Sequence, residues 1–121
     1  LVNPGHIARC LEDARQYGGA CLSVSVKDTI QQADEQGFLA FTPSRSQLRC
    51  AQTPQIFEKE GYLKGLALAR RQGKEFTDDC QIYALAGGRI YLTPGSYTNF
   101  KITTPEDVPA AERILQQRES L

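Results

Sequence analysis

Three polar clusters are the parts of this sequence whose side chains could bind and orient a ligand. Each cluster falls at the end of an expected strand or at the start of an expected helix, where ligands bind in open α/β sheets. We therefore treat them as candidate ligand-binding groups. The clusters are Lys27-Asp28-Thr29, Arg45 with Gln52-Thr53-Pro54-Gln55, and Thr77-Asp78-Asp79 with residues 99–105.

Taken singly, each cluster also fits a structural role. Lys27 and Asp28 fit ordinary surface charges, and Arg45 fits a solvated loop charge. Thr77 and Thr104 fit helix N-caps, because a threonine hydroxyl accepts a hydrogen bond from a free backbone N–H group. Only the occurrence of all three clusters together, and in this order, favours a functional interpretation.

Metal, nucleic-acid and membrane chemistry are not favoured. The four cysteines contain no Cys-x-x-Cys pair and His6 is the only histidine, so no metal site is expected. The formal net charge is zero and the pI is about 6.8, which argues against a nucleic-acid partner. No apolar run approaches the roughly 20 residues that span a bilayer. Reduced, mostly buried thiols in a cytoplasmic protein are the usual interpretation.

Helical and strand patterns alternate along the chain. Asn3 and Pro4 predict a helix start, and Gly18-Gly19 predict its end. Residues 20–26 predict a central strand, and residues 27–42 predict a hairpin with its turn at 34–37. The remaining expected elements are a helix at 55–71, a helix capped by Thr77 and stopped by Gly87-Gly88, a strand at 89–92, an extended piece at 97–102, and a last helix from 104 to about 118 in which Pro109 is awkward.

This order predicts an α/β fold with a doubly wound, mostly parallel, Rossmann-like sheet and a projecting β-hairpin arm. A core of this kind needs more strands than the 121 residues supply, so we expect the C-terminal half of a larger sheet. The sequence contains no Met, so we expect that it does not begin at its own start codon.

Four strings together resemble one family. They are VKDTI, R-x-x-L-x-x-AQTPQ-x-F, TDD and N-x-KITTPED. In this order they are similar to 2-C-methyl-D-erythritol 4-phosphate cytidylyltransferases, over essentially all 121 residues. The resemblance implies transfer of CMP from CTP to a polyol phosphate with release of pyrophosphate, and Mg²⁺ bound with CTP. The nucleophile would be a phosphate oxygen, already largely ionised at pH 7 because its second pKa is about 6, so no general base is needed.

The resemblance assigns five residues to the acceptor site. Arg45 and Lys101 would be the catalytic cations that contact the acceptor phosphate, and Arg45 suits a bidentate contact. Thr29 would reach into the site of a neighbouring subunit in a homodimer, and Thr53 and Thr77 would complete the substrate-binding set. Two neighbouring positions depart from the family pattern: Phe100 stands where Ile is usual, and Arg49 where Trp is frequent.

The resemblance also implies domain limits. Residues 1–121 would form the C-terminal part of a single nucleotidyltransferase domain, with residues from about 27 to 50 as the dimerisation arm and its base. The glycine-rich CTP loop of the family is not in this sequence, so we expect the chain by itself to be inactive.

Two other interpretations remain open. Ribitol-5-phosphate cytidylyltransferases share TPQ-x-F and N-x-KITTP, and Asp79-Cys80 resembles their T-D-A-C variant. Ala51 and Pro105-Glu106-Asp107 favour the methylerythritol enzyme. The third possibility is a non-catalytic module, which dimerises through its arm or binds a small molecule.

Overall fold

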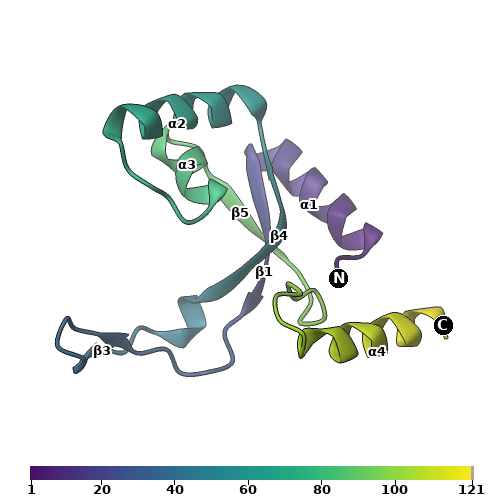
Figure 1. The fold of residues 1–121 in the computed structure, drawn as a ribbon. Coiled ribbons are helices and arrows are strands. Elements are labelled where there is room, and N and C mark those ends of the chain that lie inside the picture. The colour runs from purple at the N-terminus through teal and green to yellow at the C-terminus, as the bar shows by residue number, and fades with distance from the viewer. Residues whose placement is uncertain (121) are drawn as a thin grey trace.

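The structure, a computed structural model that describes residues 1–120, is a mixed α/β fold with a long arm (Figure 1). A three-stranded sheet has the order β4-β1-β5, and a two-stranded hairpin forms the arm. The sheet strands are β1 (Gly19–Ser25), β4 (Arg49–Phe57) and β5 (Ile90–Pro94), and the hairpin strands are β2 (Gln32–Ala33) and β3 (Leu39–Phe41). The helices are α1 (Pro4–Tyr17), α2 (Lys59–Gln72), α3 (Asp79–Leu85) and α4 (Asp107–Glu119), with a 3-10 turn at Arg45–Gln47.

The central strand is β1, as its sequence predicts. Its first residues, Gly19 to Ser23, are buried, and it pairs parallel with β5 and antiparallel with β4. The α/β class is thereby confirmed. Among the described strands the sheet is mixed, because the chain runs out along β1, turns at the arm and returns along β4.

Strand β4 corrects one prediction. The expected helix at 55–71 begins only at Lys59, because the chain stays extended to Phe57 in register with β1. Gln52 to Gln55 therefore lie in a strand and not in a turn. Pro54 is tolerated there because it lies in the register shift between Ala51 and Gln55, where β4 makes no ladder pair with β1, so its missing N–H breaks no ladder bond.

Helix α1 covers one face of the sheet and begins and ends where the sequence predicts. The Asn3 side chain accepts a hydrogen bond from the His6 backbone N–H (2.9 Å), and Pro4 is the first helical residue. Gly18 ends the helix with a φ of 99°, in the region that favours glycine. The helix buries Cys10 and Ala14 against β1 in the core cluster, which also includes Ala20 and Leu22, with Val2 and Ile56 packed beside it.

Helices α2 and α3 pack together through Gly65. A Cβ at this position would lie 2.0 Å from the carbonyl oxygen of Ile82, so only glycine permits the approach. The sequence predicts Thr77 as the N-cap of α3, but the N-cap is Asp78. Asp78 accepts from the Gln81 N–H (3.1 Å), and the Gln81 side chain returns to the cap backbone, so both members of a capping box are present.

The segment from residue 95 to 106, here called the strap, joins β5 to α4. It was expected to be extended at 97–102, but it forms turns with no ladder pairing. The Asp107 carboxylate accepts from the N–H groups of Thr103 (2.9 Å) and Thr104 (3.0 Å), which fixes the start of α4. Pro109 is the third helical residue, where the N–H has no intrahelical acceptor, so its position is not awkward.

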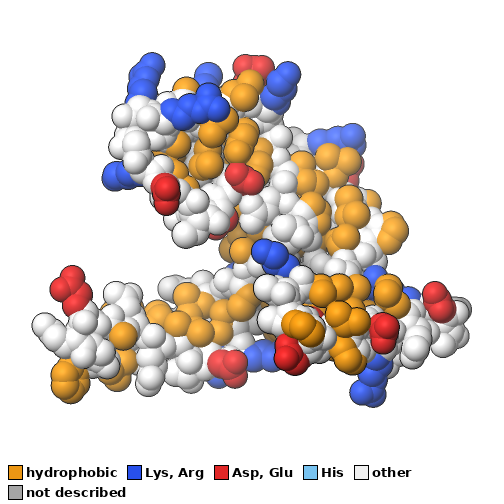
Figure 2. All heavy atoms as spheres, in the orientation of Figure 1, with side chains coloured by type: hydrophobic (Ala, Val, Ile, Leu, Met, Phe, Trp, Pro, Cys, Tyr) orange, Lys and Arg blue, Asp and Glu red, His pale blue; other side chains and the backbone are white. Residues whose placement is uncertain are grey.

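The arm projects away from the sheet (Figure 1) and carries apolar side chains (Figure 2). Its turn is closed by Asp34, whose side chain accepts from two backbone N–H groups, and Gly37 has a φ of 91°. The predicted hairpin is therefore confirmed. Phe38 is 72% exposed, an unusual state for an aromatic side chain. The other exposed apolar residues of the arm are Ile30, Leu39 and Phe41. Within residues 1–120, no helix combines the length and apolar character that crossing a membrane requires.

Candidate functional site

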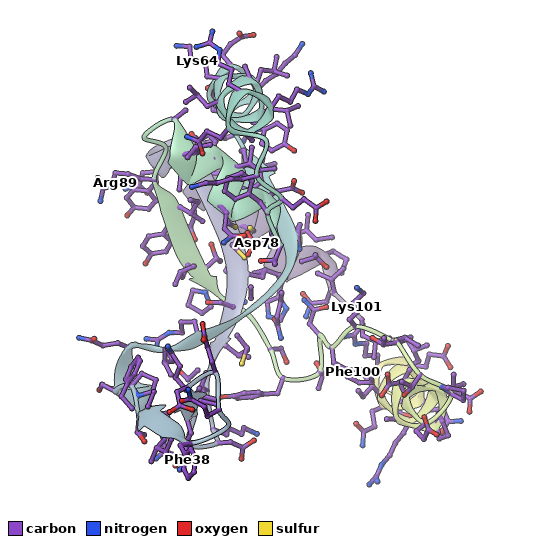
Figure 3. The ribbon with its side chains drawn as sticks, turned by 60° about the vertical axis from the view of Figure 1, so that its left-hand side comes forward. Phe38, Lys64, Asp78, Arg89, Phe100 and Lys101 are labelled. Atoms are coloured by element: carbon purple, nitrogen blue, oxygen red, sulfur yellow. The ribbon has the colours of Figure 1, made fainter. Side chains whose placement is uncertain are left out.

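The main hollow of the molecule is the β4–strap cleft. Its volume is about 660 Å³. Strand β4 forms one wall, the strap forms another, and Asp78 at the start of α3 contributes to a third (Figure 3). The lining residues are Leu1, Cys50, Ala51, Gln52, Thr53, Gln55, Asp78, Asn99, Phe100, Lys101 and Ile102.

Two neutral amides join the walls of the cleft. The Gln52 amide on β4 donates to the Ser96 carbonyl on the strap (2.8 Å). In the opposite direction, the Asn99 amide donates to the Thr53 carbonyl (2.8 Å) and lies 3.5 Å from the Gln52 side-chain oxygen. Asn99 is only 6% exposed. Buried polar groups must be paired, and these two pairs fix the strap on β4.

Lys101 and Thr53 are brought together in this cleft, although 48 positions separate them in the sequence. Both residues are exposed. The one ion pair within residues 1–120 joins Arg15 to Glu12, so Lys101 forms no ion pair with a described carboxylate, although Asp78 lines the same cleft. An ammonium group in the same cleft as the Thr53 hydroxyl suits an anionic ligand such as a phosphate.

Asp78 lies on the opposite side, with the predicted Thr77 immediately before it. The Thr77 N–H and hydroxyl both donate to the Gln81 side-chain oxygen (2.9 Å each), which fixes Thr77 at the N-terminal end of α3. Thr77 does not line the cleft itself. Asp78 contributes a negative charge to the cleft. It can accept hydrogen bonds from a hydroxylated ligand.

Three of the four thiols, those of Cys10, Cys21 and Cys80, have a raised pKa. Burial, followed by neighbouring Cys21 and Asp78, raises the pKa of the Cys80 thiol to about 12. Burial also raises the pKa of Cys21 and of Cys10. A thiol with a raised pKa stays protonated at neutral pH, and only the thiolate attacks or binds metal.

Arg45 and Thr29 lie outside this cleft. The Arg45 guanidinium donates to the Lys27 carbonyl (2.7 Å) and lines a separate hollow of about 350 Å³ at the base of the arm. Thr29 is exposed on the segment that leads into the arm. Within one chain, therefore, Arg45 and Lys101 do not share a cavity, and a common phosphate contact remains a prediction.

A second set of contacts joins the arm to the strap. The Lys27 ammonium lies 3.8 Å from the centre of the Tyr97 ring, a cation–π contact, and the Tyr97 hydroxyl donates to the Ser25 carbonyl (2.8 Å). These contacts place the arm base beside the strap. Sequence inspection gave no sign of them.

Sequence reasoning also missed the roles of three lining residues. Asn99, Gln52 and Asp78 stand inside the polar clusters, but only their neighbours were selected as site residues. The available signal was an uncharged amide in each of two motifs, Gln52 in AQTPQ and Asn99 at the start of N-x-KITTPED. Among residues 1–120, no group of three His, Cys, Asp or Glu side chains is arranged to hold a metal ion.

Comparison with known proteins agrees with this description. The family model described as "IspD: 2-C-methyl-D-erythritol 4-phosphate cytidylyltransferase" matches residues 1–117. A cytidylyltransferase of that name from Desulforamulus reducens is 42% identical over 118 residues, covering 98% of this chain and 50% of the relative. A chloroplastic one from Oryza sativa subsp. japonica is 41% identical over 118 residues, covering 98% and 40% respectively.

Solved structures show the same fold. The crystal structure of the enzyme of that name from Thermus thermophilus superimposes with a TM-score of 0.82 at 34% identity, covering 96% of this chain and 57% of that one. A 4-diphosphocytidyl-2C-methyl-D-erythritol synthase from Anaerococcus prevotii gives a TM-score of 0.87 at 26% identity, covering 96% and 54%. The chain spans about half the length of the relatives that it matches.

Proposed function

Because this chain belongs to the 2-C-methyl-D-erythritol 4-phosphate cytidylyltransferase family, we propose that the protein carrying it transfers CMP from CTP to 2-C-methyl-D-erythritol 4-phosphate and releases pyrophosphate. The observation that carries the proposal is Lys101, which forms no ion pair within residues 1–120 and lines the β4–strap cleft together with Thr53. This chain supplies the acceptor-binding part of the enzyme.

The cleft suits an acceptor that is an anion at one end and a polyol along its length. Lys101 binds the acceptor phosphate and lowers its repulsion from the triphosphate of CTP. Thr53 and Asp78 bind the hydroxyl groups. The phosphate oxygen attacks without a general base because its second pKa is about 6, so the residues act by positioning and by stabilising charge.

Mg²⁺ belongs to the proposal as a partner of CTP. Bound there, it would neutralise phosphate charge as pyrophosphate leaves. Residues 1–120 contain no cluster of three ligands that fits it, so no step of this chain is assigned to the metal. A cytoplasmic location is likewise proposed, supported by the four free cysteines.

The arm extends the proposal to a homodimer. Arg45 and Thr29 lie at the arm and not in the cleft of their own chain. Exposed Phe38, Leu39 and Phe41 make the arm apolar where it projects, and a two-stranded hairpin is marginal in isolation. Pairing of two arms around a twofold axis would cover these side chains and bring Arg45 and Thr29 to the partner's cleft.

The test is acceptor competition in the full-length protein. CTP is supplied with 2-C-methyl-D-erythritol 4-phosphate and ribitol 5-phosphate together, and the two products are quantified. We expect methylerythritol phosphate to be preferred by about 10²-fold, since ribitol 5-phosphate carries one more hydroxyl and lacks the branching methyl, and a site rejects an added hydroxyl by about this factor. A kcat/KM that favours ribitol 5-phosphate would assign the chain to the alternative activity. Absence of turnover with both would support a non-catalytic module.

A further inference from the structure

We propose that Asn99 is a positioning residue that sets the place of Lys101 in the β4–strap cleft. The proposal rests on the function proposed above, because it takes Lys101 as the cation that meets the acceptor phosphate. Asn99 itself does not touch the reacting atoms in this proposal. It acts through the strap, which carries Lys101 two residues further along the chain.

The strap is held mainly by side chains. It has no ladder partner, and between Gly95 and Lys101 its only backbone–backbone hydrogen bonds are the Asn99 N–H to Ser96 carbonyl (3.0 Å) and the Gly95 N–H to Ser23 carbonyl (2.8 Å). Tyr97 attaches its first part to the arm base, and Asn99 is the attachment nearest to Lys101 that reaches β4. Lys101 is exposed, and no ion pair orients it. The position of its ammonium group therefore depends on how the preceding residues are attached to β4.

Asn99 provides that attachment with its side-chain amide nitrogen. One N–H group donates to the Thr53 carbonyl (2.8 Å), and the same nitrogen lies 3.5 Å from the Gln52 side-chain oxygen, so both contacts reach β4. The Gln52 amide holds the strap a second time at Ser96. Asn99 is the one member of this group that joins the strap to the backbone of Thr53, a proposed substrate-binding residue.

The chemistry of the side chain explains why an amide is suited to the position. At 6% exposure, a charged side chain would lose its hydration, and a hydroxyl has one proton and could not donate to both β4 oxygens. A neutral amide has two N–H donors on one nitrogen. Its loss would leave the Thr53 carbonyl without this donor and release the strap, which would move Thr53 and Lys101 relative to each other.

Such a movement would affect acceptor binding more than CTP binding. Misplacement of a reacting group by about 1 Å can cost about 10²-fold in rate. We therefore expect Asn99→Ala in the full-length enzyme to lower kcat/KM for the acceptor by about 10²-fold, while KM for CTP stays within about threefold of wild type.

The matched control is Thr93→Val. Thr93 is also buried, and its hydroxyl donates to Asp13 (2.7 Å), but it does not line the β4–strap cleft. Both substitutions remove a hydrogen bond of a buried side chain. If that loss of stability were the cause, the two variants would have similar acceptor kinetics. If Asn99→Ala does not fold, Asn99→Leu keeps the branched shape and the number of heavy atoms of the side chain and removes its hydrogen bonds.

The decisive measurement is a double-mutant cycle with Lys101→Ala, with affinity for inorganic phosphate measured by calorimetry alongside turnover. If Asn99 acts through Lys101, the double variant will be no worse than Lys101→Ala alone, because residues in one network are not additive. Multiplicative losses, or normal acceptor kinetics and phosphate affinity in Asn99→Ala, would overturn the inference. Phosphate affinity distinguishes the two proposals. A wild-type enzyme without turnover would contradict the proposed function. The double-mutant cycle measured in phosphate affinity would still show whether Asn99 acts through Lys101.

Discussion

Arg45 and Lys101 offer a test of whether one acceptor site is built from two chains. In a single chain they lie in separate hollows, and Arg45 is engaged by the Lys27 carbonyl at the base of the arm. We expect Arg45→Ala and Lys101→Ala to be nearly inactive when pure, and to recover activity when the two full-length variants are mixed in one dimer.

The magnitude follows from the exposure of the two cations. Two unit charges 4 Å apart interact by about 4 kcal/mol at an effective dielectric constant of 20. Arg45 and Lys101 are both exposed, so screening leaves roughly 2–3 kcal/mol of transition-state stabilisation for each, or about a 10²-fold loss of rate. In a random mixture about half of the dimers are mixed, and each has one intact site of two. The mixture should therefore show about one quarter of wild-type activity.

The assay is pyrophosphate release after the two variants are unfolded together and refolded, with each pure variant treated in the same way. Lys101→Ala mixed with Thr53→Val is the matched control. Both residues line the cleft of the same chain, so no mixed dimer regains a complete site. If the Arg45 and Lys101 variants fail to complement each other, although mixed dimers are present, the two residues do not act across a dimer interface.

Three further predictions concern packing, the start of α4 and assembly. Gly65→Ala should destabilise the protein by about 2–3 kcal/mol in chemical denaturation, because its Cβ would meet the Ile82 carbonyl at 2.0 Å; unchanged stability would contradict the tight packing of α2 on α3. Hydrogen bonds from two backbone N–H groups of the strap hold the pKa of Asp107 below its usual value of 3.8. The contribution of Asp107 to the α4 start is thus complete above that pH and is lost as the pH falls through the lower, folded-state pKa; amide resonances of the strap should report this step in wild type and not in Asp107→Ala. Deleting residues 30–41 from the full-length protein should give monomers by sedimentation, whereas a dimer of unchanged affinity would exclude the arm as the interface.

Elements whose signals are local could be predicted from the sequence. Asn3 and Pro4 at the start of α1, Gly18 at its end and the turn around Gly37 each act through neighbouring residues. The central strand was also predictable, because a β-rich run of small residues fits a position buried on both faces. In these places local propensity and global packing agree.

Elements that depend on distant partners could not be predicted. Strand β4 is specified by its register on β1, which lies earlier in the chain, before the arm, and Pro54 obscures its pattern. The cap of α3 was misplaced by one residue, because Thr77 and Asp78 are both good caps and the reciprocal bond from Gln81 decides between them. For the candidate site, the motifs predict Lys101 and Thr53, which line one cleft, but the separation of Arg45 from Lys101 follows only from the three-dimensional arrangement.

The strap contacts both the base of the arm and the wall of the cleft. Its Tyr97 contacts the arm base, through the ring to Lys27 and through the hydroxyl to Ser25. Two residues later, Asn99 is attached to the other strand that borders the arm, at the Thr53 carbonyl. Lys101 follows after Phe100. The arm base, the sheet and Lys101 are therefore joined through one short segment of the strap.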